Sequence, residues 1–478
     1  MSSLSSHSKK PSDPSSSPYL YGTKRAVLQV AWPIGISMIS YSLKSFVDTL
    51  MVGQLGLEAL AGVGFAGILA WSLTSFPFGA LRGQRPLVSQ YLGAGDRQST
   101  RRFGIHAFYF AGLISLVFFL FGHIFGDLTT AFGKTSNMSP QSADMAGRYL
   151  GLRMMWTAPM LLSLSIAEYL RSTERPQLPM IADLVSQPLN IVFNFALIFG
   201  SWGCPEMGIE GAAIGTGLAD CCSLLILSVC LLPKKHTFKS WGAQFSFKWR
   251  AMKRVLSVGY TGGCQFALES GSFVLTTYFI GFLGTASLAV QQAAIQLVHL
   301  SILPAIALAD GGSVLVGKYV GELEWDRARE TVRSVLELTV SFMMCMALVF
   351  VFFGQSLMAL FIKDPNPVLQ KEALALSGLV ALATAFWQVG DAIQVTYRHC
   401  LRATGDHVWV MRVGVLMSWI LSVPLIACTI FWFKGTLFHA WVMMGVSIYF
   451  GAWIFHRRWK SGVWREKRLV DDQGSEPS

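Results

Sequence analysis

Long apolar stretches separated by short polar segments dominate the chain. Two examples, residues 108–125 and 338–353, contain no charged side chain. Runs of this length indicate transmembrane helices rather than helices of a soluble core. Beginning near Ala26, roughly twelve such segments of about 20 residues each follow one another. The pattern predicts an all-α integral membrane protein with about twelve transmembrane helices and no large soluble domain.

Composition and charge support this prediction. Hydrophobic residues make up 53% of the 478-residue chain and charged residues only 14%, and the mean hydropathy is +0.48. A soluble domain carries about 25% charged residues. The net charge of +11 comes largely from basic loops that fall on one side of the predicted bundle. By the positive-inside rule this side, with both termini, is cytoplasmic. We therefore expect a multi-pass protein of the plasma (inner) membrane and no nucleic-acid binding.

The two halves of the sequence resemble each other. "MVGQLGLEALA" (51–61) matches "FIGFLGTASLA" (279–289), and "VSQYLGAGDRQSTR" (88–101) matches "VGKYVGELEWDRAR" (316–329), both at an offset of 228. Farther on, "LRSTERPQLPM" (170–180) matches "LRATGDHVWVM" (401–411) at an offset of 231. Because the offset spans an even number of helices, the halves keep one orientation. The repeat predicts two six-helix lobes related by a pseudo-two-fold axis along the membrane normal, with a cavity between them and alternating access.

These patterns also set the expected domain limits. We predict a disordered cytoplasmic tail over 1–25, an N-terminal lobe over 26–232, a basic cytoplasmic linker over 233–254, a C-terminal lobe over 255–456 and a cytoplasmic tail over 457–478. The first 18 residues are rich in Ser and Pro and lack the apolar core of a signal peptide.

Three carboxylates lie inside predicted helices: Asp48 in "SLKSFVDTL", Glu269 in "GGCQFALESGSF" and Asp391 in "FWQVGDAIQVTY". A carboxylate buried in the membrane must be neutralised by a proton, a cation or a basic partner. We expect these groups to form the ion-coupling set. For Asp48 two interpretations stay open, because Lys44 lies one turn away on the same helix face and could pair with it.

Uncharged polar and aromatic side chains surround the other two carboxylates. Neither has a basic residue within one turn on its own helix, so Glu269 and Asp391 together are the better candidates for binding a proton or Na⁺. No other metal site and no cofactor is expected. The amides of Asn190 and Asn194 share a helix face and act either as interhelical contacts or as pathway donors. The predicted substrate pathway comprises Gln265, Gln388, Gln394, Asn190, Asn194, Tyr278, Trp387 and Tyr397.

Two opposite charges occupy equivalent positions of the repeat. Arg82 and Asp310 are separated by 228 residues and could meet near the lobe interface. We favour the alternative that both lie near the cytoplasmic membrane surface and extend to water, because Arg85 adds a second arginine one turn on.

The ordered motifs resemble those of the multidrug and toxic compound extrusion (MATE) transporters. The likeness runs from "FVDTLMVGQLG" (46–56) through "CPEMGIEGAAIGTGLAD" (204–220) to "GDAIQVTYRHCLRATGD" (390–406) and covers about residues 26 to 455. Within that family it is similar to the bacterial drug/Na⁺ or drug/H⁺ antiporters. The resemblance implies a V-shaped, two-lobed exporter of organic, often cationic, compounds, with Asp48, Glu269 and Asp391 as coupling residues. Arg82, Arg85 and Asp310 depart from the family pattern and raise the hypothesis of anionic or zwitterionic substrates.

Other functions fit less well. A major-facilitator carrier shares twelve helices and parallel halves, and a flippase for lipid-linked precursors would favour the basic residues Lys44, Arg82 and Arg85. An enzyme would need a metal or nucleophile constellation, whereas the histidines here are scattered. A channel would need a filter motif. The expected protein is a monomeric antiporter whose partners are small organic compounds and the lipid bilayer.

Overall fold

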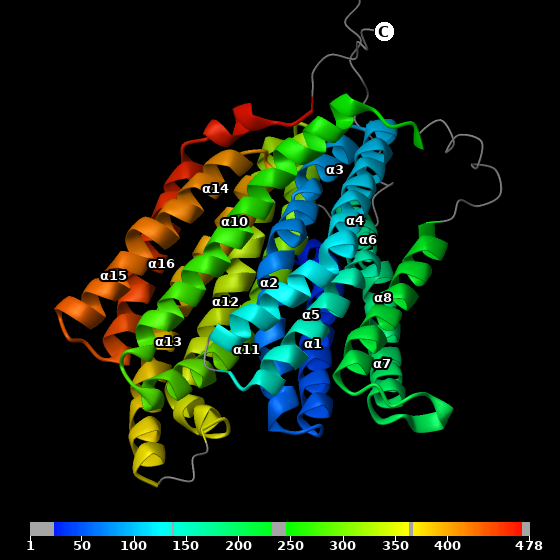
Figure 1. Cartoon of the computed structure of the whole chain (residues 1–478). Coiled ribbons are helices and arrows are strands. Elements are labelled where there is room, and N and C mark those ends of the chain that lie inside the picture. Colours follow the sequence, from blue (N-terminus) through cyan, green and yellow to red (C-terminus); the bar gives the residue numbers. More distant parts are fainter. Residues whose placement is uncertain (1–22, 136–137, 232–244, 363–366, 471–478) are drawn as a thin grey trace, which may run out of the picture.

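A computed structural model describes residues 23–135, 138–231, 245–362 and 367–470 of the chain (Figure 1). In these residues the first half forms the helices α1 (Lys24–Gly53), α2 (Leu57–Arg82) continued by α3 (Gln84–Gly93), α4 (Arg97–Thr135), the bent pair α5 (Pro140–Met155) and α6 (Thr157–Ser172), α7 (Gln177–Phe199) and α8 (Ile209–Leu231). The short 3₁₀ turn η2 (Ser201–Gly203) lies between α7 and α8.

The second half repeats this order. Its spans are α10 (Trp249–Gly281), α11 (Thr285–Gly321), α12 (Trp325–Ala359), α13 (Pro367–Ala403), the continuous rod of α14 (His407–Leu416), η4 (Met417–Ser422), α15 (Val423–Ala427) and η5 (Cys428–Trp432), and finally α16 (Leu437–Lys460) followed by η6 (Val463–Lys467). The turns η4 and η5 are π-helical.

The helices confirm a membrane protein. In the described residues ten helices are long and apolar enough to cross a membrane, or eleven when α5 and α6, bent by 46°, count as one broken span. The 33-residue helix α10 is long enough to be the twelfth, although its middle is interrupted by polar residues such as Gln265 and Glu269. The expected all-α fold with about twelve spans is therefore confirmed.

The repeat is visible in the helix boundaries and in the turns. Helices α1 and α10 end at Gly53 and Gly281, 228 positions apart. Gly56 and Gly284, at the same offset, have φ of 107° and 99°. A further pair, Gly95 and Leu323, also adopts positive φ, of 76° and 64°. A leucine in this region of φ is unusual, so the turn geometry follows from the repeat rather than from the residue present.

The predicted domain limits shift by a few residues. Helix α1 begins at Lys24, inside the predicted tail, and α10 begins at Trp249, inside the predicted linker. The predicted C-terminal tail contains the end of α16 and the buried Trp464, which stacks on Trp459 at 4.4 Å between ring centroids. Residues 1–22 and 471–478 of the predicted tails, the last residue of the predicted N-terminal lobe and residues 233–244 of the predicted linker lie outside the described residues.

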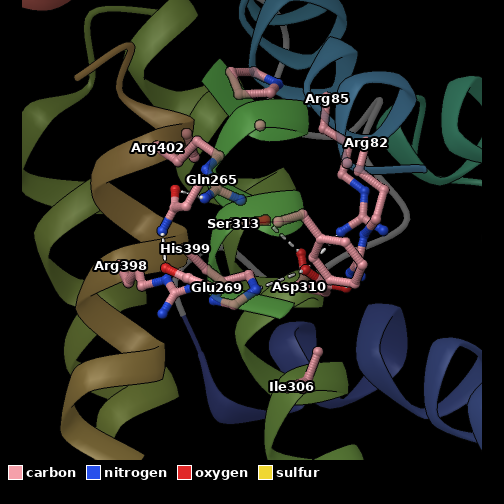
Figure 2. A pocket seen from close by; sticks show the side chains of 15 residues that line it. Arg82, Arg85, Gln265, Glu269, Ile306, Asp310, Ser313, Arg398, His399 and Arg402 are labelled. Atoms are coloured by element: carbon pink, nitrogen blue, oxygen red, sulfur yellow. Dashed lines mark hydrogen bonds and ion pairs between the residues drawn. The ribbon is translucent and has the colours of Figure 1, made fainter. Parts of the chain in front are cut away.

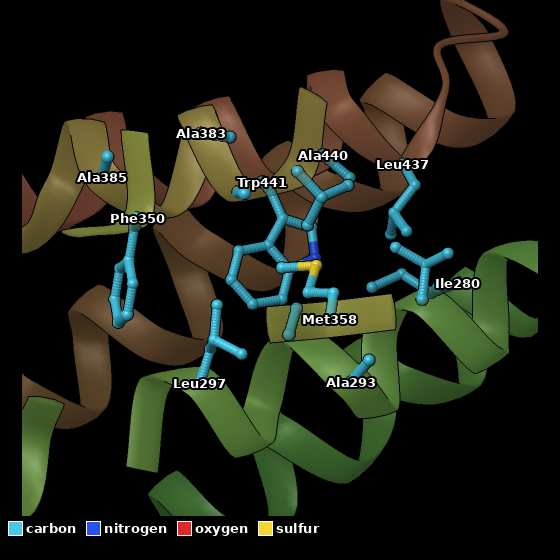
Figure 3. Packing of buried hydrophobic residues seen from close by; sticks show 14 of the residues in the cluster. Ile280, Ala293, Leu297, Phe350, Met358, Ala383, Ala385, Leu437, Ala440 and Trp441 are labelled. Carbon is cyan, nitrogen blue, oxygen red and sulfur yellow. The ribbon is translucent and has the colours of Figure 1, made fainter. Parts of the chain in front are cut away.

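Apolar side chains form separate cores within the bundle. A large cluster of the C-terminal half joins α11, α12, α13 and α16 around Trp441, Phe350 and Leu297 (Figure 3). A second cluster joins the start of α1 to α11, α12 and α13, because Val27, Val30 and Ile34 pack among residues of the other half. Helix α1 therefore contacts both lobes.

The two halves touch closely on one side, which we call the terminal side because α1 begins there and α16 ends there. Helices α2 and α10 lie side by side near the top of Figure 1 and diverge towards the bottom. At their crossing a Cβ added to Gly79 would lie 2.5 Å from the carbonyl oxygen of Gly262. Only glycine permits such an approach.

The turns on the opposite side are exposed. A Cβ added to Gly53 or Gly281 would meet no atom within 4 Å, and Leu57, at the start of α2, is 85% exposed. The lobes therefore pack closely at the terminal side, whereas α2 and α10 diverge towards exposed turns on the other side (Figure 1).

Candidate functional site

A pocket of about 140 Å³ lies between the two lobes, where α2 and α3 of the first half meet α10, α11 and α13 of the second. Ionisable side chains converge on it (Figure 2). Four arginines line it together with two carboxylates and a histidine: Arg82, Arg85, Arg398, Arg402, Glu269, Asp310 and His399.

Asp310 of α11 joins the lobes on one wall of this pocket. Its carboxylate is 1% exposed and forms ion pairs with Arg82 and, at 2.6 Å, with Arg85 from the other lobe. His399 Nε2 lies 3.4 Å from the same carboxylate. Arg85 also donates to Glu168 of α6. The favoured expectation that Arg82 and Asp310 extend to water is thus wrong, because each is held by a partner across the lobe interface.

Glu269 lies on the facing wall and also has a basic partner. Arg398 of α13 donates to its carboxylate, and Gln265, one turn earlier on α10, donates to it at 2.8 Å. Arg402, one turn beyond Arg398, donates to the side-chain oxygen of Gln265. Two residues one turn apart on α10 thus face two arginines one turn apart on α13 (Figure 2).

Asp391 lies on α13 outside this pocket. It is 7% exposed, and in the described part of the chain its Oδ2 has no hydrogen-bond partner. The side chain of Gln388, one turn before it, is fully buried and also lacks partners for both amide atoms. The structure therefore does not bring Asp391 into contact with Glu269, although Arg398 follows Asp391 by two turns on the same helix face.

The third predicted carboxylate, Asp48, belongs to a separate cluster in the first lobe. Asn194 of α7 donates to it at 2.7 Å, and Asn190 donates to Thr216 of α8 at 3.3 Å. Lys44 does not pair with Asp48; its Nζ lies 3.5 Å from Asp220 of α8. The two asparagines thus connect α7 to its neighbouring helices, as one of the two interpretations proposed.

The remaining predicted pathway residues lie away from the pocket. Trp387 packs against Trp441 in the core of the second lobe, and Tyr397 bonds His456 at 3.0 Å within another core cluster. Both side chains are buried, and neither lines the inter-lobe pocket. Tyr278 is 63% exposed and contacts Phe282. The remaining residue, Gln394, packs against the backbone of Gly451 in α16.

Sequence reasoning missed Arg398 and Arg402. Both belong to the motif "GDAIQVTYRHCLRATGD" (390–406). They follow Asp391 by 7 and 11 positions, which places all three residues on one face of α13. The repeat carried a further signal, since it aligns Arg402 with Arg171 of the first half.

Known proteins share this sequence pattern and fold. The MatE family model matches residues 33–196 and 263–428, once in each half. A probable multidrug resistance protein NorM of Bacillus subtilis (strain 168) is 25% identical over 84% of this chain and 87% of its own length. Another, from Rhizobium meliloti (strain 1021), is 27% identical over 89% of each chain.

Solved structures agree with the fold. A MOP superfamily transporter from Pyrococcus furiosus superposes with a TM-score of 0.83 at 16% identity, over 93% of this chain and 97% of that one. An outward-facing multidrug resistance MATE transporter gives 0.81 at 17% identity, over 94% and 97%. The family match in both halves removes the major-facilitator alternative. The chain belongs to the MatE family of multidrug and toxic compound extrusion transporters, and it is a multi-pass membrane protein.

Proposed function

We propose that the protein is a secondary active efflux transporter that exports small organic compounds in exchange for Na⁺ or H⁺ by alternating access. Relatives named as probable multidrug resistance proteins match most of the chain. The internal repeat and the pocket between the lobes suit a carrier in which one lobe rocks against the other.

The proposed orientation in the membrane rests on the charge pattern. We propose that the terminal side is cytoplasmic and that the membrane is the plasma membrane, because the basic loops near Arg97–Arg102 and Arg327–Arg333 lie on the terminal side. On this orientation the closely packed side of the lobes faces the cytoplasm, so we propose that the described arrangement is outward-facing. A relative of the same fold has been solved in an outward-facing conformation.

The observation that carries the antiport proposal is the environment of Asp391. Its carboxyl group is buried in a membrane-spanning helix, and the described residues offer its Oδ2 no partner. An ionised carboxylate cannot stay buried without compensation, so this group is suited to hold a proton or a Na⁺ ion. The unpartnered Gln388 oxygen one turn away is a second ligand that Na⁺ could use.

Glu269 is less suited to this role because Arg398 already neutralises it. We propose instead that Arg398 links the two carboxylates. When Asp391 releases its ion, its negative charge attracts Arg398, two turns along α13, and weakens the Arg398–Glu269 pair. Asp48, which accepts a hydrogen bond from Asn194, is a further candidate for ion coupling in the first lobe.

The test uses purified protein in proteoliposomes with ethidium as the transported dye. A Na⁺ gradient and a proton gradient are imposed separately on the unmutated protein, on Asp391→Asn and on Asp326→Asn. Asp326 is an exposed aspartate at the start of α12 and serves as the control. One gradient should drive ethidium in the unmutated protein and the control but not in Asp391→Asn. Equal transport by all three would remove Asp391 from the mechanism, and no gradient-driven transport at all would refute antiport.

A flippase for lipid-linked precursors is the second candidate, favoured by the arginines of the pocket. Such a carrier would move a fluorescent lipid-linked pyrophosphate between leaflets and would export no ethidium under either gradient. Lys44 does not support this alternative, since it pairs with Asp220 outside the pocket.

A further inference from the structure

We propose that the inter-lobe pocket binds an anionic group, a carboxylate or phosphate, of an amphipathic solute, through Arg402 and Arg398. This inference names the substrate class of the proposed transporter and rests on that proposal for the direction of movement. Organic anions and zwitterions would then be compounds that this pocket binds, in addition to the cationic compounds that the carrier is proposed to export.

The charges that line the pocket do not balance. Its four arginines face two lining carboxylates, Glu269 and Asp310. A third carboxylate, Glu168, bonds Arg85 behind the wall but is shared with Arg171. In a membrane interior an excess positive charge is costly unless a counter-charge joins it. A bound anion supplies that counter-charge.

The excess positive charge belongs to Arg402. Arg82 and Arg85 form ion pairs with Asp310, and Arg398 forms one with Glu269. The recorded partner of Arg402 is the neutral oxygen of Gln265, and in the described residues no carboxylate forms an ion pair with it. A guanidinium carries five N–H donors, so donors of Arg402 remain for a ligand.

Arg398 adds a second donor beside it. Its Nε is buried and, in the described part of the chain, has no hydrogen-bond partner. The two arginines are one turn apart on α13, where like charges repel each other. An anion between them would relieve this repulsion, and the planar guanidinium matches carboxylate and phosphate oxygens in two-point contacts.

The pocket has room for the anionic group but not for a whole drug-sized molecule. Its volume of about 140 Å³ corresponds to a few water molecules. The side chains of Arg398 and Glu269 are 24% and 20% exposed, so a ligand can reach them. Phe266 lines the pocket and contacts Trp71 edge to face, at 5.6 Å between ring centroids. An apolar ligand body could lie on these rings while its anionic group contacts the arginines.

Equilibrium binding tests the proposal without any ion gradient. The probe is carboxyfluorescein, followed by fluorescence polarisation with the full chain in phosphatidylcholine nanodiscs, and ethidium is the cationic comparison. Benzoate and phenyl phosphate, added as competitors, distinguish carboxylate from phosphate recognition. Arg412→Gln, an exposed arginine on α14, is the matched control for Arg402→Gln.

We expect carboxyfluorescein to bind and Arg402→Gln to weaken its binding about tenfold, since a charged hydrogen bond is worth roughly that factor. Arg412→Gln and ethidium binding should not change. Glu269→Gln should tighten carboxyfluorescein binding, because it releases Arg398 from its ion pair. If Glu269 served only in ion coupling, this substitution would not increase the affinity for carboxyfluorescein.

The proposal is overturned if carboxyfluorescein does not bind, or if Arg402→Gln and Arg412→Gln bind it equally. It is also overturned if phosphatidylglycerol added to the nanodiscs displaces the probe, because the pocket would then take a lipid headgroup. Failure of gradient-driven ethidium transport with intact probe binding would refute antiport and leave the anion site standing. Gradient-driven ethidium transport without carboxyfluorescein binding would refute the anion site and leave the antiport proposal standing.

Discussion

Arg171 and Arg402 occupy equivalent positions in the two lobes but have different surroundings. Arg171, at the end of α6, contacts Glu168 at 2.9 Å and Asp183 at 3.6 Å. Arg402, at the end of α13, donates to the neutral Gln265. The repeat therefore determines the position of the arginine in each lobe, whereas the number of carboxylates that pair with it differs between the lobes. One arginine stabilises its lobe, and the other faces the inter-lobe pocket with spare donors.

The buried aspartates differ in the same way. Asp48 of the first lobe accepts a hydrogen bond from Asn194, whereas Asp391 of the second lobe has an oxygen without a partner in the described residues. Buried polar atoms without a partner are uncommon in folded proteins, and bound water, an ion or a functional role accounts for them. Under the antiport proposal, Asp391 rather than Asp48 is therefore the group that exchanges its ion.

The largest expected effect concerns the ion pairs between the lobes. Asp310→Asn would leave Arg82 and Arg85 without their shared carboxylate. Removing one member of a buried ion pair costs about 3–5 kcal/mol. Thermal unfolding in detergent should show a marked fall in Tm. Glu210→Gln is the control, because its partner Arg148 is 61% exposed and such pairs contribute about 0–1 kcal/mol. Equal changes in Tm for the two variants would contradict this account.

A second prediction compares the equivalent arginines directly. Arg171→Gln removes the contacts with Glu168 and Asp183 and should destabilise the protein by about 1–3 kcal/mol. Arg402→Gln removes an excess charge and loses one hydrogen bond to Gln265, which is worth about 0.5–1.5 kcal/mol, so it should destabilise the protein less than Arg171→Gln. Unfolding of both variants in the same detergent checks the difference. A larger loss from Arg402→Gln would show that its charge is structural.

A third prediction compares the closely packed terminal side of the bundle with the exposed turns of the opposite side. Gly79→Ala would place its Cβ 2.5 Å from the Gly262 carbonyl oxygen, and overpacking of this kind costs about 1–3 kcal/mol. The lobes should then separate more often on the terminal side, which hydrogen exchange of the α3 amides would detect as faster exchange. Gly53→Ala, where no atom lies within 4 Å of the added Cβ, should leave the exchange rates unchanged. Unchanged exchange in Gly79→Ala would mean that the crossing tolerates the methyl group.

The smallest effect concerns equivalent turns. Gly95→Ala places a Cβ on a residue with φ of 76° and should destabilise the protein by about 1 kcal/mol. Leu323→Gly removes the corresponding strain at φ of 64° and should be neutral or slightly stabilising. Tm measurements decide the point. A destabilising Leu323→Gly would show that the leucine side chain contributes more than the strain costs.

The fold could be predicted from the sequence because its main signals are local or periodic. Apolar runs of membrane length indicated the spans, and the 228-residue offset indicated two lobes. The same offset aligned Arg82 with Asp310, although the sequence analysis favoured the alternative that both side chains extend to water. A buried pair between lobes depends on how closely α2 approaches α10, which glycines such as Gly79 determine and which the hydropathy pattern does not report.

The site was harder to predict because its contacts join distant residues. Spacing along one helix showed no basic neighbour for Glu269, yet Arg398 reaches it from 129 positions away. The pairing of Lys44 with Asp220 across helices was hidden for the same reason. Aromatic residues near Asp391 suggested a cavity, but Trp387 and Tyr397 fill the core of the second lobe. Sequence spacing identifies helix faces, and tertiary packing decides what each face meets.

The most direct test of the central claim, that Asp391 in the second lobe exchanges the coupling ion, is substrate-driven ion flux. Proteoliposomes loaded with ethidium are diluted into dye-free buffer, and the movement of Na⁺ and H⁺ is recorded without an imposed ion gradient. The account predicts that the unmutated protein and Asp48→Asn move one of these ions against the dye, while Asp391→Asn moves neither. Ion flux that persists in Asp391→Asn and disappears in Asp48→Asn would contradict it and assign coupling to the first lobe.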